Sequence, residues 1–278
     1  KNLPRAAIKI DFGTEVRLGP GKVRLLELIA ETGSISAAAR QMEMSYRRAW
    51  LLIDEVNGIF GNPVVETVTG GTGGIGRAIC AALAEAGANV IVGYNRSGDS
   101  AQSLAAALPE VSGGHLAAPA QVTSSASLEE LRRGIEQRFG RVDIVVNCAG
   151  TTRFVAHPDL DGLDDGLIDD ILATNVRGPF AVVRAMLPML RKSERAVVVN
   201  ISSIASVTAN GSNVIYCASK AALDNMTKSL ARALAPRIRV LAVSPGLVDT
   251  EFIANLDEQW RNEQVAKTPL KSLATPRH

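Results

Sequence analysis

Short apolar segments alternate with helical segments along most of this chain. The apolar segments cover residues 89–92, 115–122, 142–147, 196–201 and 238–243, and the helical ones cover 78–86, 101–108, 128–139, 171–190 and 218–234. Strands that are continuously apolar belong to parallel sheets with helices on both faces. We therefore predict an α/β fold with a doubly wound parallel sheet, whose ligand lies at the carboxyl ends of the strands.

The first sixty residues follow another pattern. Apolar residues at helical spacing predict helices over 21–32, 37–42 and 46–57, with Ser36 and Ser45 as N-caps of the second and third. Such a helix-turn-helix places the start of its second helix in the major groove of DNA. The DNA-binding candidates at that helix start are Ser45, Tyr46, Arg47 and Arg48. The alternative is a small three-helix domain with a solvated basic face.

Composition indicates a globular protein. The chain has 278 residues, a net charge of +2 and 46% hydrophobic residues, without the apolar run of about 18 residues that a membrane-spanning helix needs. No secretory pattern opens the sequence, and Cys80, Cys148 and Cys217 have no metal-ligand spacing. We expect two domains, at 1–63 and 64–278, with reduced thiols, no bound metal and a cytoplasmic location.

Residues 64–76 support two interpretations. With the residues that follow, they form a first apolar strand and the loop Thr69-Gly70-x-x-x-Gly74-x-Gly76, whose glycines let the backbone approach a pyrophosphate at a helix N-terminus. With the residues before, they begin the β-hairpin wing of a winged helix. The helical segment that follows favours the phosphate loop of a Rossmann-type sheet. Glu66 is unusual there, because an unpaired buried carboxylate is costly, and it suggests a fusion of two coding sequences at Thr-Gly-Gly.

Three further groups of residues follow predicted strands. They are Asn147 to Gly150, Ser203, and Pro245 to Thr250. Tyr216 and Lys220 are four residues apart and share one face of a predicted helix. A phenol exchanges protons poorly at neutral pH unless a cation stabilises its anion, and Lys220 can provide that charge. Each group alone is compatible with a turn or a surface pair, but their order on successive strand ends indicates a nicotinamide-dependent active site.

Residues 68–276 resemble the short-chain dehydrogenase/reductase family, in particular its 3-oxoacyl-carrier-protein reductases. The resemblance implies hydride transfer between NAD(P)H and a carbonyl or alcohol, with Tyr216 as the general acid/base. It implies that Lys220 lowers the pKa of Tyr216 and binds the ribose, that Ser203 polarises the carbonyl, and that Asn175 holds a proton-relaying water. The cofactor-binding residues it assigns are Thr69, Gly70, Gly74, Ile75, Gly76, Asn147, Ala149, Gly150, Pro245, Gly246 and Thr250. The family pattern continues past residue 276, so we expect a sheet that lacks its last strand.

The cofactor preference is predicted from the end of the second strand. An acidic residue there would bind the ribose hydroxyls of NAD. This sequence has Tyr94-Asn95-Arg96 instead, and the Arg96 guanidinium suits a 2′-phosphate. We therefore favour NADP(H) over NAD(H).

The N-terminal region carries a second resemblance. Residues 17–74, with Gly33-Ser-Ile-Ser-Ala-Ala-Ala-Arg and Ser45-Tyr-Arg-Arg-Ala-Trp, are similar to the winged-helix domain of molybdate-responsive transcription regulators and, more distantly, to LysR-type regulators. The resemblance implies an alternative function: a DNA-binding regulator whose reductase-like domain senses the cofactor or is inactive. We expect a small carbonyl or alcohol substrate and no membrane partner, with duplex DNA and a homo-oligomer as further candidate partners.

Overall fold

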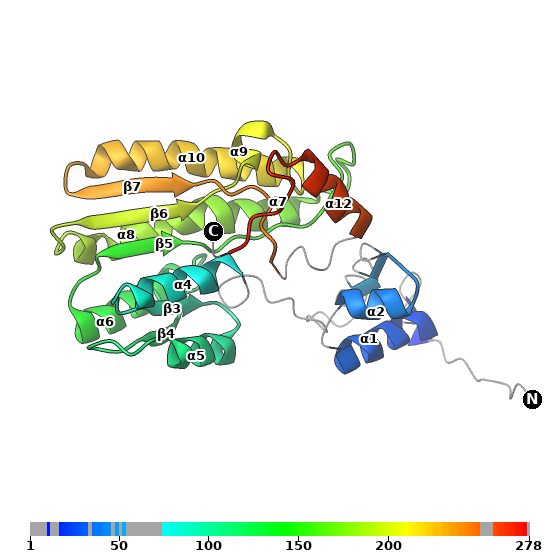
Figure 1. Cartoon of the computed structure of the whole chain (residues 1–278), viewed down its shortest axis with the longest axis horizontal. Coiled ribbons are helices and arrows are strands. Elements are labelled where there is room, and N and C mark those ends of the chain that lie inside the picture. Colours follow the sequence, from blue (N-terminus) through cyan, green and yellow to red (C-terminus); the bar gives the residue numbers. More distant parts are fainter. Residues whose placement is uncertain are drawn as a thin grey trace, which may run out of the picture. The chain divides into compact units, whose positions relative to one another are not determined.

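Figure 1 shows the chain as a computed structural model. The structure describes residues 10–11, 17–32, 35–45, 48–49, 52–53, 74–250 and 258–276. The chain forms two compact units, one made of residues 1–67 and 251–273 and the other of residues 68–250 and 274–278. No helix in the described ranges is long and apolar enough to cross a membrane.

The first unit has a small helical core. Its elements are β1 (Ile10–Asp11), the antiparallel β2 (Arg17–Leu18), α1 (Pro20–Thr32), α2 (Ile35–Gln41) and α12 (Glu258–Lys267). Leu25, Leu28 and Ile35, at 1%, 2% and 8% exposure, join α1 to α2. The first predicted helix is confirmed. The prediction of Ser36 as an N-cap is wrong, because α2 already begins at Ile35, whose buried side chain belongs to this core.

The predicted third helix is described only in part. Ser45 Oγ accepts a hydrogen bond from the backbone N–H of Arg48 at 3.2 Å, which is the contact expected of its N-cap. Residues 48–49 and 52–53 are helical, and the Arg48 side chain is exposed. Tyr46, Arg47 and the segment 64–73, which includes the predicted wing and first strand, lie outside the described residues.

The second unit alternates strands and helices as predicted. Its strands are β3 (Ile91–Tyr94), β4 (Leu116–Pro119), β5 (Ile144–Asn147), β6 (Ala196–Ile201) and β7 (Ile238–Val243). Its helices are α4 (Ile75–Glu85), α5 (Gly98–Ala107), α6 (Ser125–Phe139), α7 (Asp165–Leu172), the π-helical turn η1 (Ala173–Arg177), α8 (Gly178–Leu190), α9 (Ala205–Thr208) and α10 (Val214–Leu234). This order confirms the predicted α/β class.

The strands of this unit pair in parallel. β3 pairs with β4, and β5, β6 and β7 form a second group in that order (Figure 1). Val145, Val198 and Val240 align across the second group and are buried under α6, α8 and α10. On the other face of these strands Leu241 and Val243 are 48% and 50% exposed. The predicted burial of both faces therefore holds for one face among the described residues.

The segment predicted as one helix over 171–190 is interrupted. α7 passes through the π-helical turn η1 into α8. A π turn holds one more residue than an α turn, and it faces Asn175 inward with 0% exposure. The turn keeps the chain helical from α7 to α8, so the observed segment still runs as one series of helical turns, as predicted, with a change of phase at η1.

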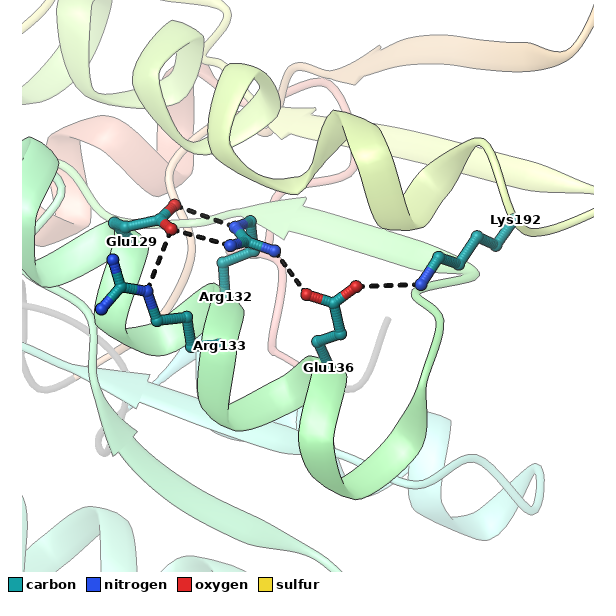
Figure 2. Close-up of polar contacts among 5 residues, drawn as sticks. All are labelled: Glu129, Arg132, Arg133, Glu136 and Lys192. Atoms are coloured by element: carbon teal, nitrogen blue, oxygen red, sulfur yellow. Dashed lines mark hydrogen bonds and ion pairs between the residues drawn. The ribbon is translucent and has the colours of Figure 1, made fainter.

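Charged side chains connect α6 to the end of α8, as Figure 2 shows. Arg132 donates to both carboxylate oxygens of Glu129, at 2.7 and 2.8 Å, and to Glu136 at 2.6 Å. Lys192 Nζ donates to Glu136 at 3.0 Å, and Arg133 donates to Glu129 at 3.2 Å. The network holds α6 against the segment that leads into β6.

Candidate active site

Tyr216 and Lys220 lie one turn apart near the start of α10. The Lys220 Nζ atom is 5.8 Å from the centroid of the Tyr216 ring, so the two side chains share a face of the helix, as predicted. Lys220 is 5% exposed, and its Nζ donates a hydrogen bond to the backbone carbonyl of Ile201 at 2.9 Å. This bond fixes the ammonium group at the carboxyl end of β6.

The Ser203 hydroxyl follows the same strand and meets the Tyr216 phenol. Burial raises the pKa of Tyr216 above its ordinary value, and the hydrogen bond with Ser203 opposes that shift. The direction differs from the lowered pKa expected from Lys220, because desolvation of the phenolate dominates. Burial likewise lowers the pKa of Lys220, against the opposing influence of Cys148 and Asp224. Tyr216 is therefore protonated at neutral pH.

Asn175 lies beside this pair and is held by the segment after β5. Its Oδ1 accepts the backbone N–H of Thr151 at 2.8 Å, and its Nδ2 donates to the carbonyl of Thr151 at 3.0 Å and to Ser219 Oγ at 3.1 Å. A Cβ atom on Gly150 would lie 3.5 Å from Asn175 Oδ1 and 3.7 Å from Lys220 Nζ. Three of the predicted site residues are thus neighbours. Thr151 and Ser219, which hold them, were not predicted.

Two of the predicted phosphate-loop residues begin α4. Gly74 has a φ of 121°, and Ile75 and Gly76 form the first turn of the helix. A Cβ atom on Gly74 would lie 3.0 Å from Thr250 Cγ2, so the loop after β7 contacts the start of α4. A helix N-terminus that begins after a glycine suits the pyrophosphate of a dinucleotide. Thr69 and Gly70 lie outside the described residues.

Backbone hydrogen bonds connect the loop after β7 to the loop after β6. The Pro245 carbonyl accepts from the backbone N–H of Ile204 at 2.9 Å, and the Val243 carbonyl accepts from Ser202 at 2.7 Å. Among the described residues, no atom lies within 4 Å of the point where a Cβ atom of Gly246 would stand. Both neighbours of Ser203 in the sequence are therefore hydrogen-bonded to the end of β7 or the loop after it, which fixes Ser203 at the carboxyl edge of the sheet.

Asn147 differs from the other predicted cofactor residues. Its side chain is 7% exposed, and its Nδ2 donates to Asn200 Oδ1 at 2.8 Å. Asn200 Nδ2 in turn donates to Thr227 Oγ1 at 2.8 Å. The Asn147 amide thus joins β5 to β6 and α10 inside the fold. Ala149, one residue before Gly150, and Arg96, two residues after β3, are exposed.

The cysteines carry no disulfide. Cys80, Cys148 and Cys217 are free thiols, as predicted. Burial raises the pKa of Cys148 to about 11, although the Lys220 charge opposes the shift. This thiol is therefore protonated beside the site and is a poor nucleophile.

The fold and these residues define a parallel α/β protein with a tyrosine–lysine pair and a helix that starts after a glycine of positive φ. Residues 65–261 match the family model described as short chain dehydrogenase. The chain belongs to the short-chain dehydrogenase/reductase family, which confirms the Rossmann-type fold and the reaction class: NAD(P)H-dependent interconversion of a carbonyl and an alcohol.

Similar proteins cover most of the second unit. The 3-oxoacyl-(acyl-carrier-protein) reductase FabG of Staphylococcus epidermidis is 32% identical over 205 residues, which are 73% of this chain and 83% of that protein. The protein of the same name from Thermotoga maritima is also 32% identical, over 75% of this chain and 84% of its own. The crystal structure of a short-chain dehydrogenase/reductase from Brucella melitensis, titled glucose/ribitol dehydrogenase, is 31% identical with a TM-score of 0.68, covering 75% of this chain and 82% of that one.

Proposed function

We propose that Tyr216 is the general acid/base of this reaction, with Ser203, Lys220 and Asn175 as its partners. The observation that carries the proposal is the position of Lys220 Nζ, 5.8 Å from the centroid of the partly buried Tyr216 ring, with the Ser203 hydroxyl acting on the phenol. A protonated phenol can donate to a carbonyl oxygen as that oxygen becomes an alkoxide, and it takes the proton back in the oxidation direction. Ser203 can donate to the same oxygen. Lys220 stabilises the phenolate that forms, and Asn175 holds the relaying water.

We also propose where the chain holds the nicotinamide cofactor, which supplies or takes the hydride when bound. The positive φ of Gly74 at the start of α4 supports a pyrophosphate there, because a glycine lets the backbone N–H groups of the helix start approach a ligand. The residues that would hold the cofactor are Thr69, Gly70, Gly74, Ile75, Gly76, Ala149, Gly150, Pro245, Gly246 and Thr250. For Asn147 only the backbone is proposed to contribute.

NADP(H) is the proposed cofactor, and 3-oxoacyl thioesters are the first substrates to test. The exposed Arg96 beyond β3 supports binding of a 2′-phosphate. The substrate proposal rests on the similarity to the two FabG reductases. We further propose that the chain has two domains, at 1–63 and 64–278. We also propose that it forms a homo-oligomer in the cytoplasm.

The test is NADPH oxidation by the full chain with 3-oxoacyl thioesters and simple ketones. Tyr216→Phe removes the transferable proton while keeping the ring, so turnover should fall by roughly 10²–10⁴-fold. The NADPH dissociation constant, measured by fluorescence, should stay within about twofold, because the phenol is not needed for binding. A wild-type chain that binds NADPH but turns over none of these substrates would contradict the catalytic proposal.

A second candidate function is DNA binding by the first unit. The hydrogen bond from Arg48 N–H to Ser45 Oγ supports a helix that starts at the predicted recognition residues. The full chain should then bind duplex DNA with an affinity that falls steeply between 50 and 200 mM salt, a range over which phosphate contacts weaken strongly. Arg48→Ala should weaken binding. Arg24→Ala, which removes an arginine paired with Glu27 on α1, is the matched control.

A further inference from the structure

Asn213 is a completely buried polar residue that directly precedes α10. Its exposure is 0%, and its amide makes three hydrogen bonds. Oδ1 accepts the backbone N–H of Tyr216 at 2.7 Å. Nδ2 donates to the carbonyl of Arg153 at 2.7 Å and to Thr152 Oγ1 at 3.1 Å. One side chain thus joins the turn that carries Tyr216 to the segment after Gly150.

The hydrogen bonds of Asn213 include two that an N-cap residue does not need. Ser, Thr or Asp can accept the bond from the third helical N–H as well as Asn can. Only an amide of this length also offers two donors to the neighbouring segment. Ser212, the preceding residue, adds two bonds to the same segment: its Oγ lies 2.6 Å from Thr152 Oγ1, and its carbonyl accepts from Val155 N–H at 2.9 Å.

The same segment is held from the other side by the active site. Asn175 binds both backbone groups of Thr151, and its Nδ2 also donates to Ser219 Oγ. The Ser219 hydroxyl donates to the carbonyl of Tyr216 at 2.7 Å. Residues 151–153 are therefore fixed by two fully buried asparagines. One of them binds the N–H of Tyr216, and the other reaches its carbonyl through Ser219.

We propose that Asn213 is a positioning residue for Tyr216. It fixes the first turn of α10 to residues 152–153. In this way it holds the Tyr216 phenol close to Ser203 and Lys220. The proposal rests on the proposed role of Tyr216. It predicts that loss of the two amide donors reduces turnover even when the helix cap is kept.

Two substitutions separate the cap from the donors. Asn213→Asp has the same shape and keeps the acceptor for Tyr216 N–H, but it places an oxygen against the Arg153 carbonyl. Asn213→Ser also keeps an acceptor and loses both donors. The matched control is Ser124→Ala, which removes an N-cap acceptor from α6, where Ser124 Oγ accepts Ser127 N–H at 3.3 Å. All variants are prepared in the full chain and compared for melting temperature, NADPH affinity, kcat and KM.

Asn213→Asp should lower kcat by up to about 10²-fold, the cost of a small misplacement of a catalytic group, with NADPH affinity within about twofold. Asn213→Ser should also lower kcat. Ser124→Ala should lower the melting temperature but keep kcat. The Asn213 variants should also show altered pH profiles of kcat, because the phenol moves relative to Ser203. An Asn213→Asp chain with wild-type kcat and pH profile would overturn the proposal.

Hydrogen exchange gives a readout that does not depend on turnover. Asn213→Asp should speed exchange over residues 151–155 and leave 213–218 nearly unchanged, whereas Asn213→Ala should speed both. If the wild-type chain has no turnover, the role of Tyr216 is refuted, and the exchange pattern alone decides whether Asn213 holds residues 151–155. Unchanged exchange at 151–155 in Asn213→Asp would refute that coupling as well.

Discussion

Gly74 and Thr250 are in contact, although 176 residues separate them in the sequence. A Cβ atom added to Gly74 would lie 3.0 Å from Thr250 Cγ2, so the start of α4 lies against the loop that follows β7. Two segments that are both proposed to hold the cofactor therefore support each other. A change in either one affects both.

Gly74→Ala should weaken NADPH binding by about 10-fold or more, since a residue with this φ costs about 1–3 kcal/mol and its methyl group meets Thr250. Gly87→Ala is the control for backbone strain alone, because Gly87 has a φ of 85° and no atom within 4 Å of its Cβ position. Fluorescence titration with NADPH measures both. Equal, small losses in the two variants would contradict a role of the Gly74–Thr250 contact in binding.

Gly211→Ala should reduce kcat by roughly 10-fold or more. Its Cβ atom would lie 3.0 Å from Cys217 Sγ and 3.2 Å from Tyr216 Cδ1, so the tyrosine ring must shift. Gly134→Ala in α6 meets nothing within 4 Å and serves as the control. It should leave kcat unchanged and raise the melting temperature, because alanine favours a helix.

The ionisation of Tyr216 can be measured directly. Burial raises its pKa above the ordinary value of 10.0, and Ser203 opposes this shift. The difference in tyrosinate absorbance between the wild type and Tyr216→Phe should therefore titrate above pH 10.0 in the free enzyme. Ser203→Ala should move the midpoint further up, because it removes the bond that favours the anion. A downward shift would show that Ser203 does not act on the phenolate.

Arg96 tests the cofactor preference. Arg96→Glu should weaken NADPH binding by at least about 10-fold while NADH binding stays the same or improves, because a carboxylate repels a 2′-phosphate but can bind ribose hydroxyls. Arg191→Glu, at the exposed end of α8, makes the same charge change away from the site. The ratio of the two dissociation constants is the measurement. Equal weakening of both cofactors by Arg96→Glu would rule out a role in discrimination.

The charged network on α6 should make the stability of the fold depend on pH in the acidic range. Arg132 is the main cause that lowers the pKa of Glu129 from 4.5 to about 2. A lowered pKa means that the carboxylate stabilises the fold above pH 4.5 and loses this effect as the pH falls toward 2. The melting temperature of Glu129→Gln should thus lie below that of the wild type at pH 6, and the difference should shrink as the pH falls from 4.5 toward 2. Glu110→Gln, at an exposed site outside the network, is the control.

The sequence predicted the strands better than the contacts. β6 and β7 have the predicted bounds because both are rich in Val, Ile, Leu and Ala, with one polar residue each, Asn200 and Arg239, and such runs favour a strand. Tyr216 and Lys220 were placed on one face by their spacing alone. The pairing of Asn175 with Thr151 depends on how the chain returns after 24 residues, and no local pattern carries that information. Asn213 had one available signal, its N-cap position three residues before Tyr216.

Because of the π turn η1, the geometry of the site depends on the number of residues in this segment as well as on their identity. Deleting one residue from Ala173–Arg177 would convert the segment to regular helix and rotate α7 by about 100° relative to α8. The Asn175 amide would then leave Thr151, although no residue of the site had been replaced. Comparisons of related genes should therefore treat an insertion or deletion in these five residues as a change to the active site, whereas one in an exposed loop alters only the surface.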